Sequence, residues 1–245
     1  MPIVVVGAGL AVAANYGTEY RGFAFLGALL LLAGELAIIG WLVNDRPIGA
    51  FIDNRNRISL SKLQAGAWTV VVLAALSTIA IYNVLAQGAE SGVTDLDIAI
   101  PGELLLAMGI SATSLVAAPA LLSLKADQQT TDAVVKEADS RVDFDVRPTV
   151  GKVLTRPAEE DASWGDLVTG DEIGNAGVPD LGKIQQLLIT VLLLGCYVAY
   201  LFIDLSTSAA PIHTMPALDK SFVWLLGLSH ASYLAYKAAP HTKTA

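Results

Sequence analysis

The sequence predicts an all-α, polytopic membrane protein with five transmembrane helices, built as one leading helix followed by a parallel tandem repeat of a two-helix hairpin. Three observations lead to this prediction. Hydrophobic residues make up 54% of the 245 residues and charged residues only 16%, whereas soluble domains have about 25% charged residues. Five apolar stretches reach the length of about 20 residues that a helix needs to cross a bilayer. Finally, two parts of the chain match each other at a nearly constant offset.

The five apolar stretches follow one another with polar segments between them. They are residues 22–43, 65–85, 98–122, 184–203 and 218–238. Residues 3–14 are also apolar, but about 12 residues are too few to cross a bilayer as a helix. We therefore expect an interfacial or packed segment there rather than a sixth crossing.

Lysine and arginine residues set the expected orientation. Of the 15 such residues, 13 fall on one side of the predicted helices: after 22–43, between 98–122 and 184–203, and after 218–238. Only Arg21 and Lys220 fall on the other side. Because basic loops remain in the cytoplasm, we expect a protein of a bacterial inner (plasma) membrane with its N-terminus outside and its C-terminus in the cytoplasm.

An internal duplication is visible when the chain is compared with itself. At an offset of 121, SLSKLQ (59–64) falls on DLGKIQ (180–185), and at an offset of 118, GISATS (109–114) falls on GLSHAS (227–232). Both copies would enter the membrane in the same direction, which implies a pseudo-twofold axis along the membrane normal. The chain then divides into 1–44 (N-terminal segment and first helix), 45–123 (repeat one), 124–163 (an acidic cytoplasmic insert) and 164–245 (repeat two).

Each copy begins with a polar lead-in before its first helix. Ser59 and Asp180 are good N-cap residues for the helices that follow, and a lysine at the headgroup level can extend its ammonium group to water. Two interpretations stay open: these residues only shape the entry of the helices, or they form a paired cytoplasmic binding surface around the axis. The candidate residues are Asp45, Asn54, Lys62 and Gln64 in repeat one and Asp166, Asn175, Lys183 and Gln185 in repeat two.

Polar side chains inside the predicted helices are a second group of candidates. Glu35 and His230 lie at the same expected depth, about 12 Å from the cytoplasmic boundary, so a contact between them is possible. Such a pair is either a hydrogen bond that fixes helix packing or a proton-sensitive element of transport or sensing. Four serines lie in the third and fifth stretches, which also carry small residues at a spacing of four. This composition suits helix packing or, alternatively, a polar path lined by the serines Ser111, Ser114, Ser229 and Ser232.

The segment between the third and fourth stretches is long and acidic. Residues 125–180 hold 13 acidic and six basic residues. Its first part, 126–140, is expected to be a polar helix that extends the 98–122 helix. Residues 147–157 are expected to be extended, because Pro148 and Pro157 interrupt helices. Residues 164–173 suit a short helix that lies on the membrane or on a neighbouring protein.

Three phrases carry a resemblance to known sequences: SLSKLQ…WTVVVLAAL, DLGKIQQLLIT and WLLGLSHASYLAYKAAPH. Over about residues 45–125 and 164–241, the chain resembles a loose set of uncharacterised bacterial multi-span membrane proteins. The resemblance implies the same fold. It implies no activity and no functional residue.

Catalytic signatures are absent from the sequence, which has no phosphate-binding loop, dinucleotide-binding glycine motif, HExxH or CxxC. We therefore expect no catalytic residue, no cofactor, no metal and no enzymatic activity. A net charge of −8 argues against nucleic acid as a partner.

Two hypotheses for the function remain. One is a structural or partner-binding subunit of an oligomeric inner-membrane assembly. It would contact lipid, and either further copies of itself or other membrane or cytoplasmic proteins through residues 124–180. The other is an oligomeric ion or solute channel with an acidic outer mouth.

Overall fold

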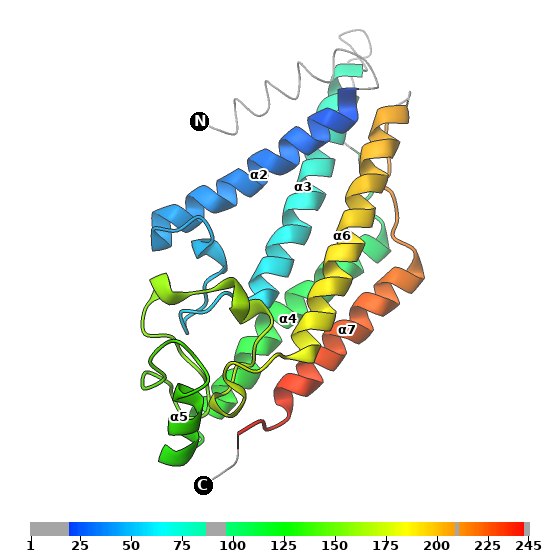
Figure 1. The fold of residues 1–245 in the computed structure, drawn as a ribbon. Coiled ribbons are helices and arrows are strands. Elements are labelled where there is room, and N and C mark those ends of the chain that lie inside the picture. Colours follow the sequence, from blue (N-terminus) through cyan, green and yellow to red (C-terminus); the bar gives the residue numbers. More distant parts are fainter. Residues whose placement is uncertain (1–19, 87–96, 209–210, 243–245) are drawn as a thin grey trace. The chain divides into compact units, whose positions relative to one another are not determined.

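The regular structure of this chain is helical (Figure 1). A computed structural model describes residues 20–86, 97–208 and 211–242. The predicted segment 3–14 lies outside these residues. In the described part, extended backbone pairs only as isolated bridges, so the all-α prediction is confirmed there. The α-helices are α2 (Arg21–Asn44), α3 (Leu60–Ala86), α4 (Gly102–Ala126), α5 (Asp132–Asp139), α6 (Leu181–Thr207) and α7 (Lys220–Ala238).

Among the described residues, four helices are long and apolar enough to cross a membrane: α2, α3, α4 and α6. They contain or overlap the predicted stretches 22–43, 65–85, 98–122 and 184–203. The helix α7 covers most of the fifth stretch, 218–238. It is shorter, with 19 residues, and carries Lys220, His230 and Lys237. It is not among the four, so a fifth crossing stays a prediction.

The helices α3 and α6 begin at polar caps, earlier than hydropathy alone indicates. The amide of Lys62 donates to Ser59 Oγ at 3.4 Å, and the amide of Lys183 donates to Asp180 Oδ1 at 3.1 Å. Each bond satisfies one of the amides that a first helical turn leaves without a partner. The two predicted N-caps are therefore confirmed, at positions that the 121-residue offset relates. The duplication itself stays a prediction.

The chain forms two compact units, which we describe separately. Unit 1 comprises Met1–Leu36, Gly66–Met108 and Val191–Val223. Its buried side chains are mainly apolar and include Phe25, Trp68, Ile79, Leu104 and Leu201. The segment before α7 is fastened by the buried amide of Asn83, which donates to the carbonyl of Ile212 at 2.7 Å and accepts from its amide at 2.9 Å.

Unit 2 comprises Ala37–Ala65, Gly109–Thr190 and Trp224–Ala245. From here on, the insert means all of residues 125–180, from the end of α4 to the start of α6. Two apolar clusters hold the loops of this unit together. One joins the first lead-in to the insert through Ile52, Ile58, Leu60, Ala162 and Leu167. The other lies inside the insert, through Ala138, Val146, Leu154, Ile173 and Ala176. Residues 125–180 are thus packed against the first lead-in rather than extended as a free tail.

The insert differs from the sequence prediction in two respects. A single helix over 126–140 is wrong, because α4 ends at Ala126 and α5 begins separately at Asp132. The turn between them lets Val134 and Val135 pack against the cluster inside the insert. The predicted helix over 164–173 is also shorter than expected: only Trp164–Leu167 and Ile173–Asn175 are helical, as 3₁₀ turns.

Candidate functional site

A cluster of buried or nearly buried charged side chains occupies the middle of unit 2. We call it the charge cluster. It brings together the first lead-in, the insert, the start of α6 and the end of α7. Its members are Asp53, Arg55, Arg57, Arg156, Asp166, Asp171, Lys183 and Lys237.

The first lead-in contributes two arginines through a tight turn. Ile52 and Ile58 pair as an antiparallel bridge, and the amide of Asp53 donates to the carbonyl of Arg57 at 2.9 Å. At the tip, Asn56 has a φ of 57°, a left-handed conformation that asparagine tolerates better than most residues. The Asp53 carboxylate accepts the backbone amides of Arg55 and Arg57 at 2.9 and 3.3 Å. The turn thereby directs both arginines into the unit.

Asp171 is the centre of the charge cluster, with cations from three parts of the chain around it. Its Oδ1 lies 3.0 Å from Nη1 of Arg55, 3.6 Å from Nη1 of Arg57 and 2.9 Å from Nζ of Lys183. Its Oδ2 lies 2.9 Å from Nζ of Lys237, although no donor is aligned with this oxygen for a hydrogen bond. One carboxylate therefore faces four cations.

Asp166 is the second buried carboxylate, and it joins side chains to backbone. Its Oδ1 accepts from Nε of Arg57 at 3.3 Å and from Nε and Nη2 of Arg156 at 3.1 and 3.0 Å. Its Oδ2 accepts the amides of Ile58 and Ser163 at 3.3 and 2.9 Å. Buried ionised groups need such complete hydrogen bonding to offset the loss of water.

A further ion pair lies at the end of α4, beside the charge cluster. Nζ of Lys125 contacts Oε1 of Glu172 at 2.5 Å and donates to the carbonyls of Lys237 and Ala239, both at 2.6 Å. The other oxygen of Glu172 accepts the amide of His241 at 3.1 Å. This pair ties the end of α4 to the end of α7 within unit 2.

The electrostatics of the charge cluster follow from its burial and its excess of cations. Burial alone would raise the pKa of Asp171, but Lys183, Lys237, Arg55 and Arg57 hold it well below its ordinary value of 3.8. Burial lowers the pKa of Arg57, and the charge of Arg55 adds to this. Burial also acts to lower the pKa of Arg55, but Asp171 and Asp53 outweigh it and raise that pKa. Asp171 is therefore ionised throughout the neutral range.

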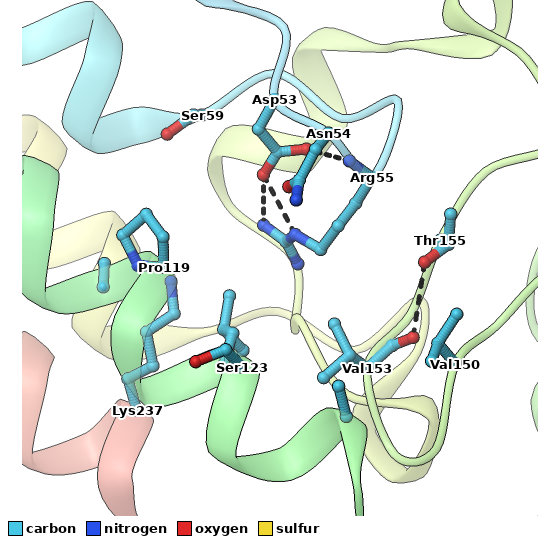
Figure 2. Close-up of a pocket in the computed structure, with 13 residues that line it drawn as sticks. Asp53, Asn54, Arg55, Ser59, Pro119, Ser123, Val150, Val153, Thr155 and Lys237 are labelled. Atoms are coloured by element: carbon cyan, nitrogen blue, oxygen red, sulfur yellow. Dashed lines mark hydrogen bonds and ion pairs between the residues drawn. The ribbon is translucent and has the colours of Figure 1, made fainter.

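A cavity of about 280 Å³ opens beside the charge cluster (Figure 2). One wall is the first lead-in, with the paired Asp53 and Arg55. The opposite wall is the end of α4, and Lys237 extends from α7 to the side of Pro119. The lining is polar on the lead-in side and mainly apolar elsewhere. It comprises Asp53, Asn54, Arg55, Ser59, Ala118, Pro119, Leu122, Ser123, Ala126, Val150, Val153, Thr155 and Lys237.

A second polar group lies between helices of unit 2, and we call it the polar layer. Nε2 of Gln186 donates to Oε1 of Gln64 at 2.8 Å and lies 3.1 Å from Nδ1 of His230. Oγ of Ser114 lies 2.6 Å from the same ring nitrogen, and Nε2 of Gln64 donates to Oγ1 of Thr190 at 2.7 Å. The polar layer thus joins one side chain or more from each of α3, α4, α6 and α7.

The structure brings several predicted candidates into these two groups. Asp166 and Lys183 belong to the charge cluster, and Gln64, Ser114 and His230 belong to the polar layer.

Other candidates lie elsewhere. Lys62 donates to the carbonyl of Ile52 at 2.7 Å, and Asn175 accepts the amide of Glu172 at 2.9 Å, so both act on local backbone. Ser111 and Ser229 are buried but have hydroxyls without a hydrogen-bond partner. The exposed candidates are Asp45, Asn54, Gln185 and Ser232, of which Asn54 lines the cavity.

The predicted Glu35–His230 contact stays a prediction. His230 belongs to unit 2, where its ring is held by Ser114 and Gln186. Glu35 is half-buried and belongs to unit 1.

The sequence reasoning missed Arg55, Arg57, Asp171 and Gln186. The first three are in contact although Arg55 and Asp171 are 116 residues apart in the sequence. No local sequence pattern predicts such a contact. Gln186 had a usable signal: it lies three residues after Lys183 and four before Thr190, and these three side chains share one helix face. The repeat alignment selected Gln185 instead, which points away from that face and is exposed.

The chemistry that these residues support is the binding of anions. Arginine and lysine around a cavity attract oxyanions. Within residues 20–86, 97–208 and 211–242, no group of three or more His, Cys, Asp or Glu side chains is placed to hold a metal ion. No protein-family model, curated protein or solved structure matches this chain.

Proposed function

We propose that this protein is a non-enzymatic integral membrane subunit that binds a partner protein through its insert, in an oligomeric assembly of a bacterial inner membrane. The observation that carries the proposal is the acidic surface of residues 125–180. The basic residues Lys125, Lys152 and Arg156 are buried, as are the acidic residues Asp166, Asp171, Glu172 and Asp180. The exposed charged residues are mostly acidic. Seven are acidic, namely Asp127, Asp132, Glu137, Asp139, Asp143, Glu159 and Glu160, and three are basic, namely Lys136, Arg141 and Arg147.

The segment around Trp164 is the part of this acidic surface best suited to binding. Trp164 is 63% exposed, and tryptophan is enriched among the residues that dominate protein interfaces. The first lead-in holds the backbone of this segment in place, because Nη1 of Arg46 donates to the carbonyls of Glu159, Glu160 and Ala162, each at 3.0 Å. A fixed backbone loses little entropy on binding. An acidic face favours a partner with a basic surface over a second copy of itself.

The orientation and the number of crossings belong to the same proposal. Every described lysine and arginine from Arg46 to Lys183, together with Lys237, falls in unit 2, whereas Arg21 and Lys220 fall in unit 1. This distribution supports a cytoplasmic insert and an outer N-terminus. The matched caps Ser59 and Asp180 support the tandem repeat, with α7 as the fifth crossing.

The test is the native mass of the complex extracted in mild detergent. We expect a mass above that of the 25.6 kDa chain. The double variant Glu159→Lys, Glu160→Lys should lose the partner, because its charges would repel a basic surface. The matched control Asp127→Lys, Asp132→Lys changes the net charge by the same amount at positions outside the segment around Trp164. This control should still bind the partner.

Two results would contradict the proposal. One is a protein that purifies without a partner and conducts ions in liposomes, which would favour the channel hypothesis. The described acidic residues of the expected outer side, Asp97, Glu103, Asp204 and Asp219, would then be the residues to neutralise first. The other is a complex that both double variants keep.

A further inference from the structure

The cavity beside Arg55 and Lys237 is built like an anion site. Two cations reach it from different elements, Arg55 from the first lead-in and Lys237 from α7 (Figure 2). Its volume of about 280 Å³ is near the lower end of the range of about 300–1,000 Å³ that is usual for small-molecule sites. A phosphate group with a short apolar extension is of the right size.

The charges around the cavity leave a surplus that an anion would neutralise. The charge cluster has five cations, Arg55, Arg57, Arg156, Lys183 and Lys237, and three carboxylates, Asp53, Asp166 and Asp171. Asp53 also lines the cavity. Its charge is already met by Nε and Nη2 of Arg55, at 2.9 and 2.6 Å. With every member ionised, the net charge of the charge cluster is positive by two.

Both lining cations retain donors for a ligand. Arginine has five N–H groups and an ammonium group has three. Arg55 uses two groups on Asp53 and one on Asp171. Lys237 uses one on the hydroxyl of Tyr233, at 2.6 Å, and its Nζ lies 2.9 Å from Oδ2 of Asp171 without being aligned for a hydrogen bond. Two donors of Arg55 and at least one of Lys237 therefore remain for the oxygens of an anion.

The apolar part of the lining indicates an amphipathic ligand at the membrane boundary. Ala118, Leu122 and Ala126 follow one another at a spacing of four along the last turns of α4, a helix long and apolar enough to cross a membrane. Basic pockets at this level of membrane helices bind lipid headgroups.

We propose that this cavity binds the phosphate oxyanion of a small amphipathic molecule, with Arg55 and Lys237 as its cationic ligands. Exposed polar groups on both walls, Asn54 and Ser123, stand at the edge of the same space. The site does not depend on the partner-binding proposal, because the segment around Trp164 does not line it.

The experiment uses the full chain in nanodiscs and two probes. In the first arm, nanodiscs of phosphatidylcholine are titrated with butyl phosphate, a soluble phosphate with a short apolar extension. In the second arm, nanodiscs contain phosphatidylglycerol, and native mass spectrometry counts the anionic lipids that stay bound. Saturable binding in either arm supports the proposal. The arm in which binding occurs shows whether the phosphate belongs to a soluble molecule or to a lipid headgroup.

The variant Ser123→Glu places a carboxylate at the edge of the cavity and should weaken binding about tenfold or more, because like charges repel at short range. The control Ser140→Glu makes the same change at an exposed position at the end of α5 and should bind as the wild type does. Asn54→Glu, on the opposite wall, should weaken binding as Ser123→Glu does and replaces it if that variant fails to fold. Absence of binding in both arms, or binding that both lining variants leave unchanged, would overturn the proposal.

Discussion

At the scale of single residues, Asp171 is the position on which unit 2 most depends. Its carboxylate contacts Arg55, Lys183 and Lys237 within 3.0 Å, and Arg57 lies slightly further away. A buried ion pair contributes little net stability when intact, because both ions lose their water. Removal of one partner is different, since the remaining charges stay buried without compensation. Here a single substitution would leave several cations facing one another.

Asp171→Asn should therefore destabilise the protein strongly, by about 3–5 kcal/mol. The amide keeps the shape of the side chain but removes its charge. The measurement is unfolding in mixed micelles, followed by tryptophan fluorescence. Asp143→Asn, which removes an exposed carboxylate of the same insert, is the control and should change stability by less than about 0.5 kcal/mol. Equal effects of the two variants would refute the assigned role.

The pH dependence of stability should follow the same residue. The pKa of Asp171 is lowered well below 3.8 in the folded protein, whereas an unfolded chain has an aspartate pKa of about 3.9. The contribution of Asp171 is thus fully present above about pH 5 and is lost as the pH falls through about 4 towards the folded pKa. Stability measured from pH 7 to pH 3 should show this loss in the wild type and in Asp143→Asn. Asp171→Asn should lack that part of the decline.

The sequence could indicate individual residues only where their role is local. Ser59 and Asp180 were predictable as caps, because a cap bonds an amide three residues away. Asp171 was not predictable, since its role depends on contacts between segments 116 residues apart. The basic residues of the first lead-in were predicted only as a signal of orientation. Their burial beside Asp171 requires the fold.

At the scale of secondary-structure elements, hydropathy located the helices but not their ends. The predicted stretch 65–85 corresponds to α3, which begins five residues earlier at Leu60. Similarly, 184–203 corresponds to α6, which begins at Leu181. The extra turns are polar and hold Gln64 and Lys183, so a search for apolar residues omits them. The extra turn of α3 supplies Gln64 to the polar layer, and the extra turn of α6 supplies Lys183 to the charge cluster.

The neighbouring glutamines of α6 provide a matched pair for the polar layer. Gln186 is fully buried and contacts Gln64 and His230, whereas Gln185 is exposed. Gln186→Leu should lower stability by about 0.5–2 kcal/mol, the range for a hydrogen bond between membrane helices, because Gln64 and His230 both lose their contact with the Gln186 amide. Gln185→Leu should have almost no effect. The measurement is the same unfolding experiment, and a larger effect at Gln185 would exclude the polar layer as described.

At the scale of the whole molecule, charge and hydropathy give one consistent arrangement. The unit that contains the insert also contains most of the basic residues, and unit 1 has a mainly apolar interior. The all-α class and the four described helices that are long and apolar enough to cross a membrane were predictable from composition and hydropathy. The cavity was not, since its walls come from segments that no sequence pattern relates.

The predicted sidedness can be measured by cysteine labelling. The single cysteine, Cys196, is first replaced by alanine, and cysteines are then introduced at the exposed positions Asp143 and Asp219. In intact cells, a membrane-impermeant maleimide should label Asp219→Cys only. Asp143→Cys should react after the membrane is permeabilised. The reverse pattern would place the insert outside and would refute the orientation.

The dependence of Arg55 on a distant counter-ion also has a consequence during synthesis. Asp171 follows Arg55 by 116 residues, which corresponds to roughly 6–23 s at a translation rate of about 5–20 residues per second. Throughout that interval, the first loop to emerge after α2 carries arginines whose later partner does not yet exist. Uncompensated basic residues next to a new transmembrane helix are the signal that retains a loop in the cytoplasm. In the proposed orientation, Arg55 and Arg57 thus have two roles in succession: first as a topology signal for the nascent chain and then, once Asp171 is made, as its partners in the charge cluster of unit 2.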